Sequence, residues 1–245
     1  MTFVVLFLAA LWAGTQNALA GGGAFITLPS LMLTGMDARA ANMTSTIALF
    51  PAQVATAWTG RRLVSGAAEL SLRALLAISL LGGGLGAGLL LVTSASFFAR
   101  LVPWLVLFAT CVFAWGSFLP HTHASPRLNR FSAGAIQFII SVYGGYFGGG
   151  IGFMMLAVLT AARLGMRTAA ATKNVLVAVI NASAVAIFVF SPQVRWQAAA
   201  IAGTGAILGG IAGAHVLQRV NERALRVIVV LIGIALTIGL FVRSA

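Results

Sequence analysis

The side chains best suited to chemistry are one lysine and a few small polar groups inside strongly apolar segments. Lys173 lies within the apolar run 168–190, and no acidic residue is near it in sequence. Burying a lysine at the centre of a bilayer costs about 2.5–3.5 kcal/mol on insertion scales. Two interpretations stay open. The ammonium group faces an anion, or it extends to the membrane interface from about five residues past its helix start.

Small polar residues also occupy matching places in the two halves of the chain. Asn42 and Thr44 lie early in the apolar segment 40–59, as Thr172 and Asn174 do in 168–190. Single residues of this kind often only join helices by hydrogen bonds. Their recurrence at one register favours a binding role.

Two glycine clusters, Gly21–Gly23 and Gly148–Gly150, interrupt apolar runs at places about 128 residues apart. Glycine disfavours helix, and a broken helix survives in a membrane only where it faces protein or a polar cavity. Paired interruptions of this kind point to a transporter's binding site. A short helix that begins at each break directs N–H groups into it. With Lys173, these ends predict a cationic pocket for a small oxyanion.

The remaining ionisable residues exclude most other chemistry. The three acids, Asp37, Glu69 and Glu222, all fall in connections, so we expect no intramembrane carboxylate to relay protons or hold sodium. Anion movement down its own gradient is then the simplest mechanism. His121 and His123 lack a third ligand, and a single cysteine forms no disulfide. We expect no metal, no cofactor and no enzymatic activity.

Composition indicates an integral membrane protein. The 245 residues are 60% hydrophobic and 7% charged, whereas soluble domains carry roughly 25% charged residues. The net charge of +12 comes from arginines scattered through short connections, which indicates a positive-inside pattern rather than nucleic-acid binding. No Lys or Arg precedes Arg39, so we interpret 1–20 as part of the mature fold rather than a signal peptide.

Apolar runs predict an all-α, polytopic bundle of two homologous repeats with Gly-broken or re-entrant helices. The repeats are 1–119 and 131–245, joined by the polar linker 120–130. The motif Leu81-Gly82-Gly83 recurs at 208–210, and Gly35-Met36 is matched by Gly165-Met166. The expected helices cover 3–19, 24–34, 40–59, 71–92, 98–119, 131–146, 151–163, 168–190, 196–217 and 224–242.

Arginine placement predicts inverted repeats with both termini outside. If each broken unit returns to its starting side, ten arginines fall on one face and four on the other. If it crosses once, the split is seven and seven. The positive-inside rule favours the uneven split.

The chain resembles the sulfite exporter TauE/SafE family, also called the toluene-sulfonate uptake permeases. The resemblance lies in AGGGAFITLPSLMLTGMDARAANMTSTIALFP at 20–51, in YGGYFGGGIGFMML at 143–156 and in AATKNVLVAVIN at 170–181. One departure is Ala157, which stands where the first repeat has Pro29.

This resemblance implies a multi-pass inner-membrane transporter, usually an exporter, of sulfite, an organosulfonate or a related sulfur-containing anion. We expect transport by alternating access around a cationic midplane site. The resemblance also implies that the substrate-binding site is lined by Gly22, Gly23, Asn42, Thr44, Gly149, Gly150, Lys173 and Asn174. A cation or metal permease and a non-transporting scaffold are the rival interpretations. Membrane exporters of this size often form homodimers, although no residue argues for one.

Overall fold

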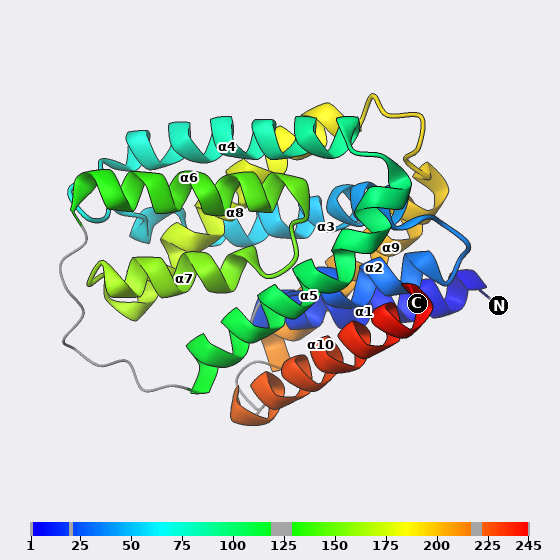
Figure 1. Ribbon diagram of the computed structural model, residues 1–245. Coiled ribbons are helices and arrows are strands. Elements are labelled where there is room, and N and C mark those ends of the chain that lie inside the picture. Colours follow the sequence, from blue (N-terminus) through cyan, green and yellow to red (C-terminus); the bar gives the residue numbers. More distant parts are fainter. Residues whose placement is uncertain (1, 20–21, 119–128, 217–221, 245) are drawn as a thin grey trace.

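The computed structural model describes residues 2–19, 22–118, 129–216 and 222–244. Over these residues the protein is all-helical, as expected, and Figure 1 shows the helices in one elongated bundle. The helices are α1 (Thr2–Leu19), α2 (Ala24–Met32), α3 (Ala38–Gly60), α4 (Leu72–Val92), α5 (Ala95–Phe118), α6 (Arg130–Tyr146), α7 (Ile151–Ala161), α8 (Met166–Phe188), α9 (Trp196–Val216) and α10 (Glu222–Ser244), with a 3-10 turn at Arg61–Leu63. Most of the linker expected at 120–130, including His121 and His123, lies outside the described residues.

Length and hydropathy make several helices suitable for crossing a bilayer. Among the described residues, Leu72–Val92, Ala95–Trp115 and Met166–Phe188 are long and apolar enough to span one, and four shorter apolar helices accompany them. Local signals fix where some helices start. The Asp37 carboxylate accepts hydrogen bonds from the N–H groups of Arg39 and Ala40 and caps α3, and Ser71 caps α4.

Helices from the first half pack against helices from the second. α1 packs along α9, and α6 packs along α4. In the same way α3 contacts α9, whereas α8 contacts α4, and α5 packs against α10. Each half therefore buries its apolar faces against the other half.

Close backbone approach at glycines explains the first two contacts. A Cβ atom at Gly86 of α4 would lie 2.0 Å from the carbonyl oxygen of Val142 in α6. A Cβ at Gly209 of α9 would lie 1.9 Å from the carbonyl oxygen of Leu11 in α1. Small residues thus let these helices approach until their backbones touch, as in other membrane helix pairs.

The central helices α3 and α8 cross in opposite directions. Gln53 contacts Asn181, whereas Gly60, later in α3, faces Ala171, earlier in α8. Near the start of α3, Thr44 contacts the backbone of Arg195, beyond the end of α8. Residue numbers therefore rise along one helix as they fall along the other.

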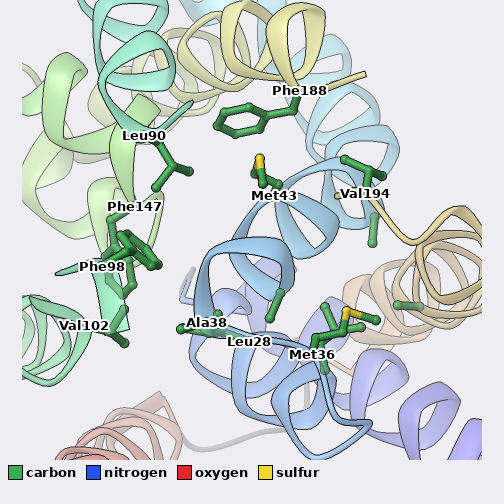
Figure 2. Packing of buried hydrophobic residues seen from close by; sticks show 14 of the residues in the cluster. Leu28, Met36, Ala38, Met43, Leu90, Phe98, Val102, Phe147, Phe188 and Val194 are labelled. Atoms are coloured by element: carbon green, nitrogen blue, oxygen red, sulfur yellow. The ribbon is translucent and has the colours of Figure 1, made fainter. Parts of the chain in front are cut away.

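A buried apolar cluster holds the ends of these helices together. Met43 of α3 and Phe188 of α8 are fully buried, and Figure 2 shows their side chains next to each other. Phe98 and Val102 of α5 lie beside Phe147, which follows α6. The cluster joins α3, α5 and α8 and borders both glycine clusters, because it includes Phe25 and Phe147.

Candidate functional site

The two helix breaks share one backbone geometry. Gly22 has φ +80° and Gly150 has φ +79°, a left-handed conformation that side chains other than glycine rarely adopt. In both places the next turn closes with the same hydrogen bond. The Phe25 N–H donates to the Gly22 carbonyl at 2.9 Å, and the Phe153 N–H donates to the Gly150 carbonyl at 3.1 Å. Glycine is therefore required at each break by conformation.

The two breaks also contact each other. A Cβ at Gly22 would lie 3.2 Å from Cε2 of Phe153, which is in the first turn of α7. A Cβ at Gly150 would lie 3.5 Å from Cζ of Phe25, which is in the first turn of α2. The starts of α2 and α7 thus meet inside the bundle. Apart from N–H groups that the turns themselves use, such as those of Phe25 and Phe153, the N–H groups at a helix start have no partner within their own helix and carry a partial positive charge.

A cavity of about 50 Å³ lies where the helix starts meet. A water molecule needs roughly 10–15 Å³ of such space, so the cavity has room for a few waters or one small oxyanion. It is lined from both halves by Asn17, Gly22, Gly23, Ala24, Leu49, Gln53, Thr56, Gly148, Gly150, Ile151, Gly152, Lys173, Asn174 and Val177. No acidic residue is among these lining residues.

Lys173 supplies the full positive charge of the cavity. Its side chain lies along the first turn of α7, because a Cβ at Gly152 would be 3.8 Å from Lys173 Cδ and 4.0 Å from Nζ. A Cβ at 152 would make only ordinary van der Waals contact with the lysine. Across the described part of the chain, no hydrogen-bond acceptor or counter-ion pairs with its ammonium group. A cation beside a positive helix start favours an anion between them.

The wall of the cavity on α3 contains an amide pair. The Asn181 side chain donates from Nδ2 to Oε1 of Gln53 at 2.6 Å. Gln53 lines the cavity, whereas Asn181 lies behind it and is 3% exposed. On the same helix the Thr56 hydroxyl donates to the Ala52 carbonyl at 2.8 Å, so its oxygen remains an acceptor.

Of the eight residues expected to line the site, the structure brings five to the cavity: Gly22, Gly23, Gly150, Lys173 and Asn174. The other three, Asn42, Thr44 and Gly149, are buried, do not line the cavity and make structural contacts. Asn42 Nδ2 donates to the Tyr146 carbonyl at 3.1 Å, at the end of α6. Thr44 Oγ1 accepts from the Arg195 N–H at 3.3 Å. The Gly149 carbonyl accepts from the Tyr143 hydroxyl at 3.0 Å.

Three polar lining residues, Asn17, Gln53 and Thr56, were not among the expected site residues. Two of them could have been found from helical spacing. Leu49, Gln53 and Thr56 follow each other at intervals of four and three residues, so they share one face of α3. Asn17 lies a few residues before the first break, and this position in the sequence could have indicated that it lines the cavity.

Comparison with known proteins identifies the family of the chain. The family model described as "Sulfite exporter TauE/SafE" matches residues 6–240, nearly the whole chain. The chain belongs to the sulfite exporter TauE/SafE family. It is therefore a multi-pass membrane transporter rather than an enzyme, and the family resemblance in the sequence is confirmed.

Curated relatives of this family cover almost the same length. A probable membrane transporter protein from Haemophilus influenzae is 28% identical over 95% of this chain and 92% of its own length. The probable membrane transporter protein ORF9 from a Sinorhizobium species is 28% identical over 96% of this chain and 90% of its own. The probable membrane transporter protein YfcA from Escherichia coli K12 is 26% identical over 98% of this chain and 90% of its own length. No solved structure matches the chain.

Proposed function

We propose that this protein exports a small sulfur-containing oxyanion, such as sulfite or an organosulfonate, by alternating access around the cavity between α2 and α7. The observation that carries the proposal is the unpaired Lys173 ammonium beside the first turn of α7. The family description, which names sulfite export, supports the same substrate class.

Electrostatics favours an anion over a cation at this place. Each helix start contributes roughly half a positive charge, and Lys173 contributes a full one. The lining residues include no carboxylate, so a cation entering the cavity would be repelled by all three groups. An oxyanion would instead accept hydrogen bonds from the ammonium group, the first-turn N–H groups and the side-chain amides of Asn17 and Asn174.

We further propose that 1–119 and 131–245 are inverted repeats. Reciprocal contacts support this. The Thr44 hydroxyl accepts from Arg195 N in the loop before α9, and the Thr172 hydroxyl accepts at 3.1 Å from Ser65 N in the loop before α4. The two threonines are equivalent in the proposed repeats, and each accepts a hydrogen bond from a loop of the other repeat. The antiparallel crossing of α3 and α8 is the arrangement that inverted repeats require.

The distribution of arginines supports an orientation with both termini outside. In Figure 1, the start of α1 and the end of α10 lie at the same end of the bundle, where Arg39, Arg100 and Arg195 also fall. The opposite end, where α3 finishes and α4, α6 and α8 begin, holds Arg61, Arg62, Arg73, Arg130, Arg163 and Arg167. The arginine-rich end is then cytoplasmic by the positive-inside rule.

An anion carried alone would be driven outward by the membrane potential. A negative interior contributes about 2.3 kcal/mol per charge per 100 mV towards export. Uniport of the anion needs no coupling ion, which agrees with a cavity lined without carboxylates.

Efflux from proteoliposomes tests the proposal. Vesicles loaded with radiolabelled sulfite, toluene-sulfonate, sulfate or sodium should release sulfite or toluene-sulfonate faster than protein-free vesicles, and a positive exterior should accelerate the release. Release of sodium alone would contradict the anion assignment. Sulfite efflux that stops when only a proton gradient is collapsed, with voltage clamped, would contradict uniport.

A further inference from the structure

In the hydrogen bond between Asn181 and Gln53, the choice of donor decides which side of the Gln53 amide an anion in the cavity would meet. Asn181 is the donor, so Oε1 of Gln53 is turned towards α8 and away from other partners. An amide has its NH₂ group opposite its oxygen. None of the described residues accepts a hydrogen bond from Nε2 of Gln53, although Gln53 lines the cavity. Two N–H donors of a residue that lines the same cavity as Lys173 are thus unpaired among the described residues.

The same pair leaves one buried atom unsatisfied. Within the described residues, Oδ1 of Asn181 has no hydrogen-bond partner, and the side chain is almost fully buried. A buried acceptor without a partner costs about 1–3 kcal/mol, and such atoms in native structures call for an explanation. The opposite direction, with Gln53 donating to Asn181, would instead turn the Gln53 oxygen to the cavity. That oxygen would repel an anion.

We propose that Gln53 donates its side-chain N–H groups to the transported oxyanion and that Asn181 is the positioning residue that fixes this orientation. The amide pair thereby makes the α3 wall a donor surface facing Lys173 across the cavity. This inference rests on the proposed anion-transport function and extends it to two residues that lie outside the glycine breaks. Gln53 comes from the first half of the chain and Asn181 from the second, so the site needs both halves.

A double-mutant cycle separates binding from positioning. The variants are Gln53→Met, which keeps the length of the side chain and removes its donors, Asn181→Leu, which removes only the positioning contact, and the combination of the two. Sulfite affinity is measured by calorimetry on full-length protein in detergent at fixed ionic strength, and the melting temperature of each variant is recorded. Neither substitution adds charge, so changes in affinity are not caused by a new electric field.

We expect Gln53→Met to weaken sulfite binding by about tenfold or more, because hydrogen bonds to charged groups are worth ~1.5–3 kcal/mol. Asn181→Leu should weaken it about threefold to tenfold in the parent and have no further effect in the Gln53→Met background. Its melting temperature should not fall, since an unsatisfied buried acceptor is removed. The positioning role would be overturned if Asn181→Leu left the sulfite affinity of the parent unchanged, or if it lowered the affinity equally in both backgrounds. A parent protein that binds no sulfite would overturn the proposed function as well, so the two failures are distinguishable.

Discussion

Gln53 and Asn181 hydrogen bond to each other although 128 residues separate them in the chain. The same separation relates Gly22 to Gly150, a left-handed glycine in each of the two breaks. In the proposed repeats Gln53 and Asn181 are counterparts, so their contact lies where the two halves cross, and Gln53 there forms part of the cavity wall. The geometry suits a transporter, because a site at the crossing point can be reached from either side when one half moves against the other.

Removing the lysine charge should impair transport without unfolding the protein. We predict that Lys173→Met lowers sulfite efflux by at least about tenfold and leaves the melting temperature unchanged or raised, because an unpaired buried cation does not stabilise the fold. Lys173→Arg should keep more activity than Lys173→Met, since it keeps the charge. Efflux and thermal stability are measured on the same preparations. Equal efflux from Lys173→Met and the parent would instead indicate that this lysine only extends to the interface.

Gly150, a left-handed glycine of the second break, should not tolerate a side chain. Gly150→Ala places a Cβ at φ +79° and 2.8 Å from the Cβ of Ala109. We expect a loss of about 1–3 kcal/mol in stability and a clear fall in efflux. Gly165→Ala is the matched control, because its φ is −59° and no atom would lie within 4 Å of the new Cβ. Similar melting temperatures for both variants would show that the break is not constrained as described.

Helix packing between α4 and α6 gives a prediction independent of the cavity. Gly86→Ala would put a Cβ 2.0 Å from the Val142 carbonyl oxygen, whereas a Cβ at Gly88 in the same helix meets nothing within 4 Å. Gly86→Ala should therefore lower the melting temperature, and Gly88→Ala should not. If Gly88→Ala proved the more damaging of the two in a thermal unfolding series, the α4–α6 contact would be misplaced.

Cysteine labelling tests the inverted arrangement. Cys111 is first replaced by alanine, and single cysteines are then introduced at Ser65, in the loop before α4, and at Ser94, between α4 and α5. Both positions are exposed. A membrane-impermeant maleimide applied to intact cells should label Ser94→Cys and should reach Ser65→Cys only after permeabilisation. Labelling in the opposite order would reverse the orientation proposed here.

Much of the helix layout could be predicted from the sequence because long apolar runs and glycine interruptions are strong local signals. The described helices lie close to the expected ranges, and α2 and α7 begin directly after the two glycine clusters. Lys173 stood out because a lone charge in an apolar run is costly. These features depend on neighbouring residues alone.

Features that depend on three-dimensional contact were harder to predict. Asn42 and Thr44 were expected to bind substrate because polar residues recur at matching places in the two apolar segments. In the structure they instead hydrogen bond to backbone groups of the other half. Gly35 was matched to Gly165 by residue type, but the left-handed conformation of Gly35, φ +87°, recurs at Arg163, φ +65°. In the proposed repeats Arg163 is therefore the counterpart of Gly35, two positions before the glycine that residue type alone had matched to it.

The most direct test is an experimental structure determined with selenite, a heavier analogue of sulfite. If two helix starts and a lysine form the binding site, the anomalous signal of selenium should lie between the first turns of α2 and α7, within roughly 4 Å of the Lys173 ammonium, as a charge-assisted contact requires. Selenium bound elsewhere, or a Lys173 side chain directed to the membrane interface with the space between Gly22 and Gly150 closed, would contradict it.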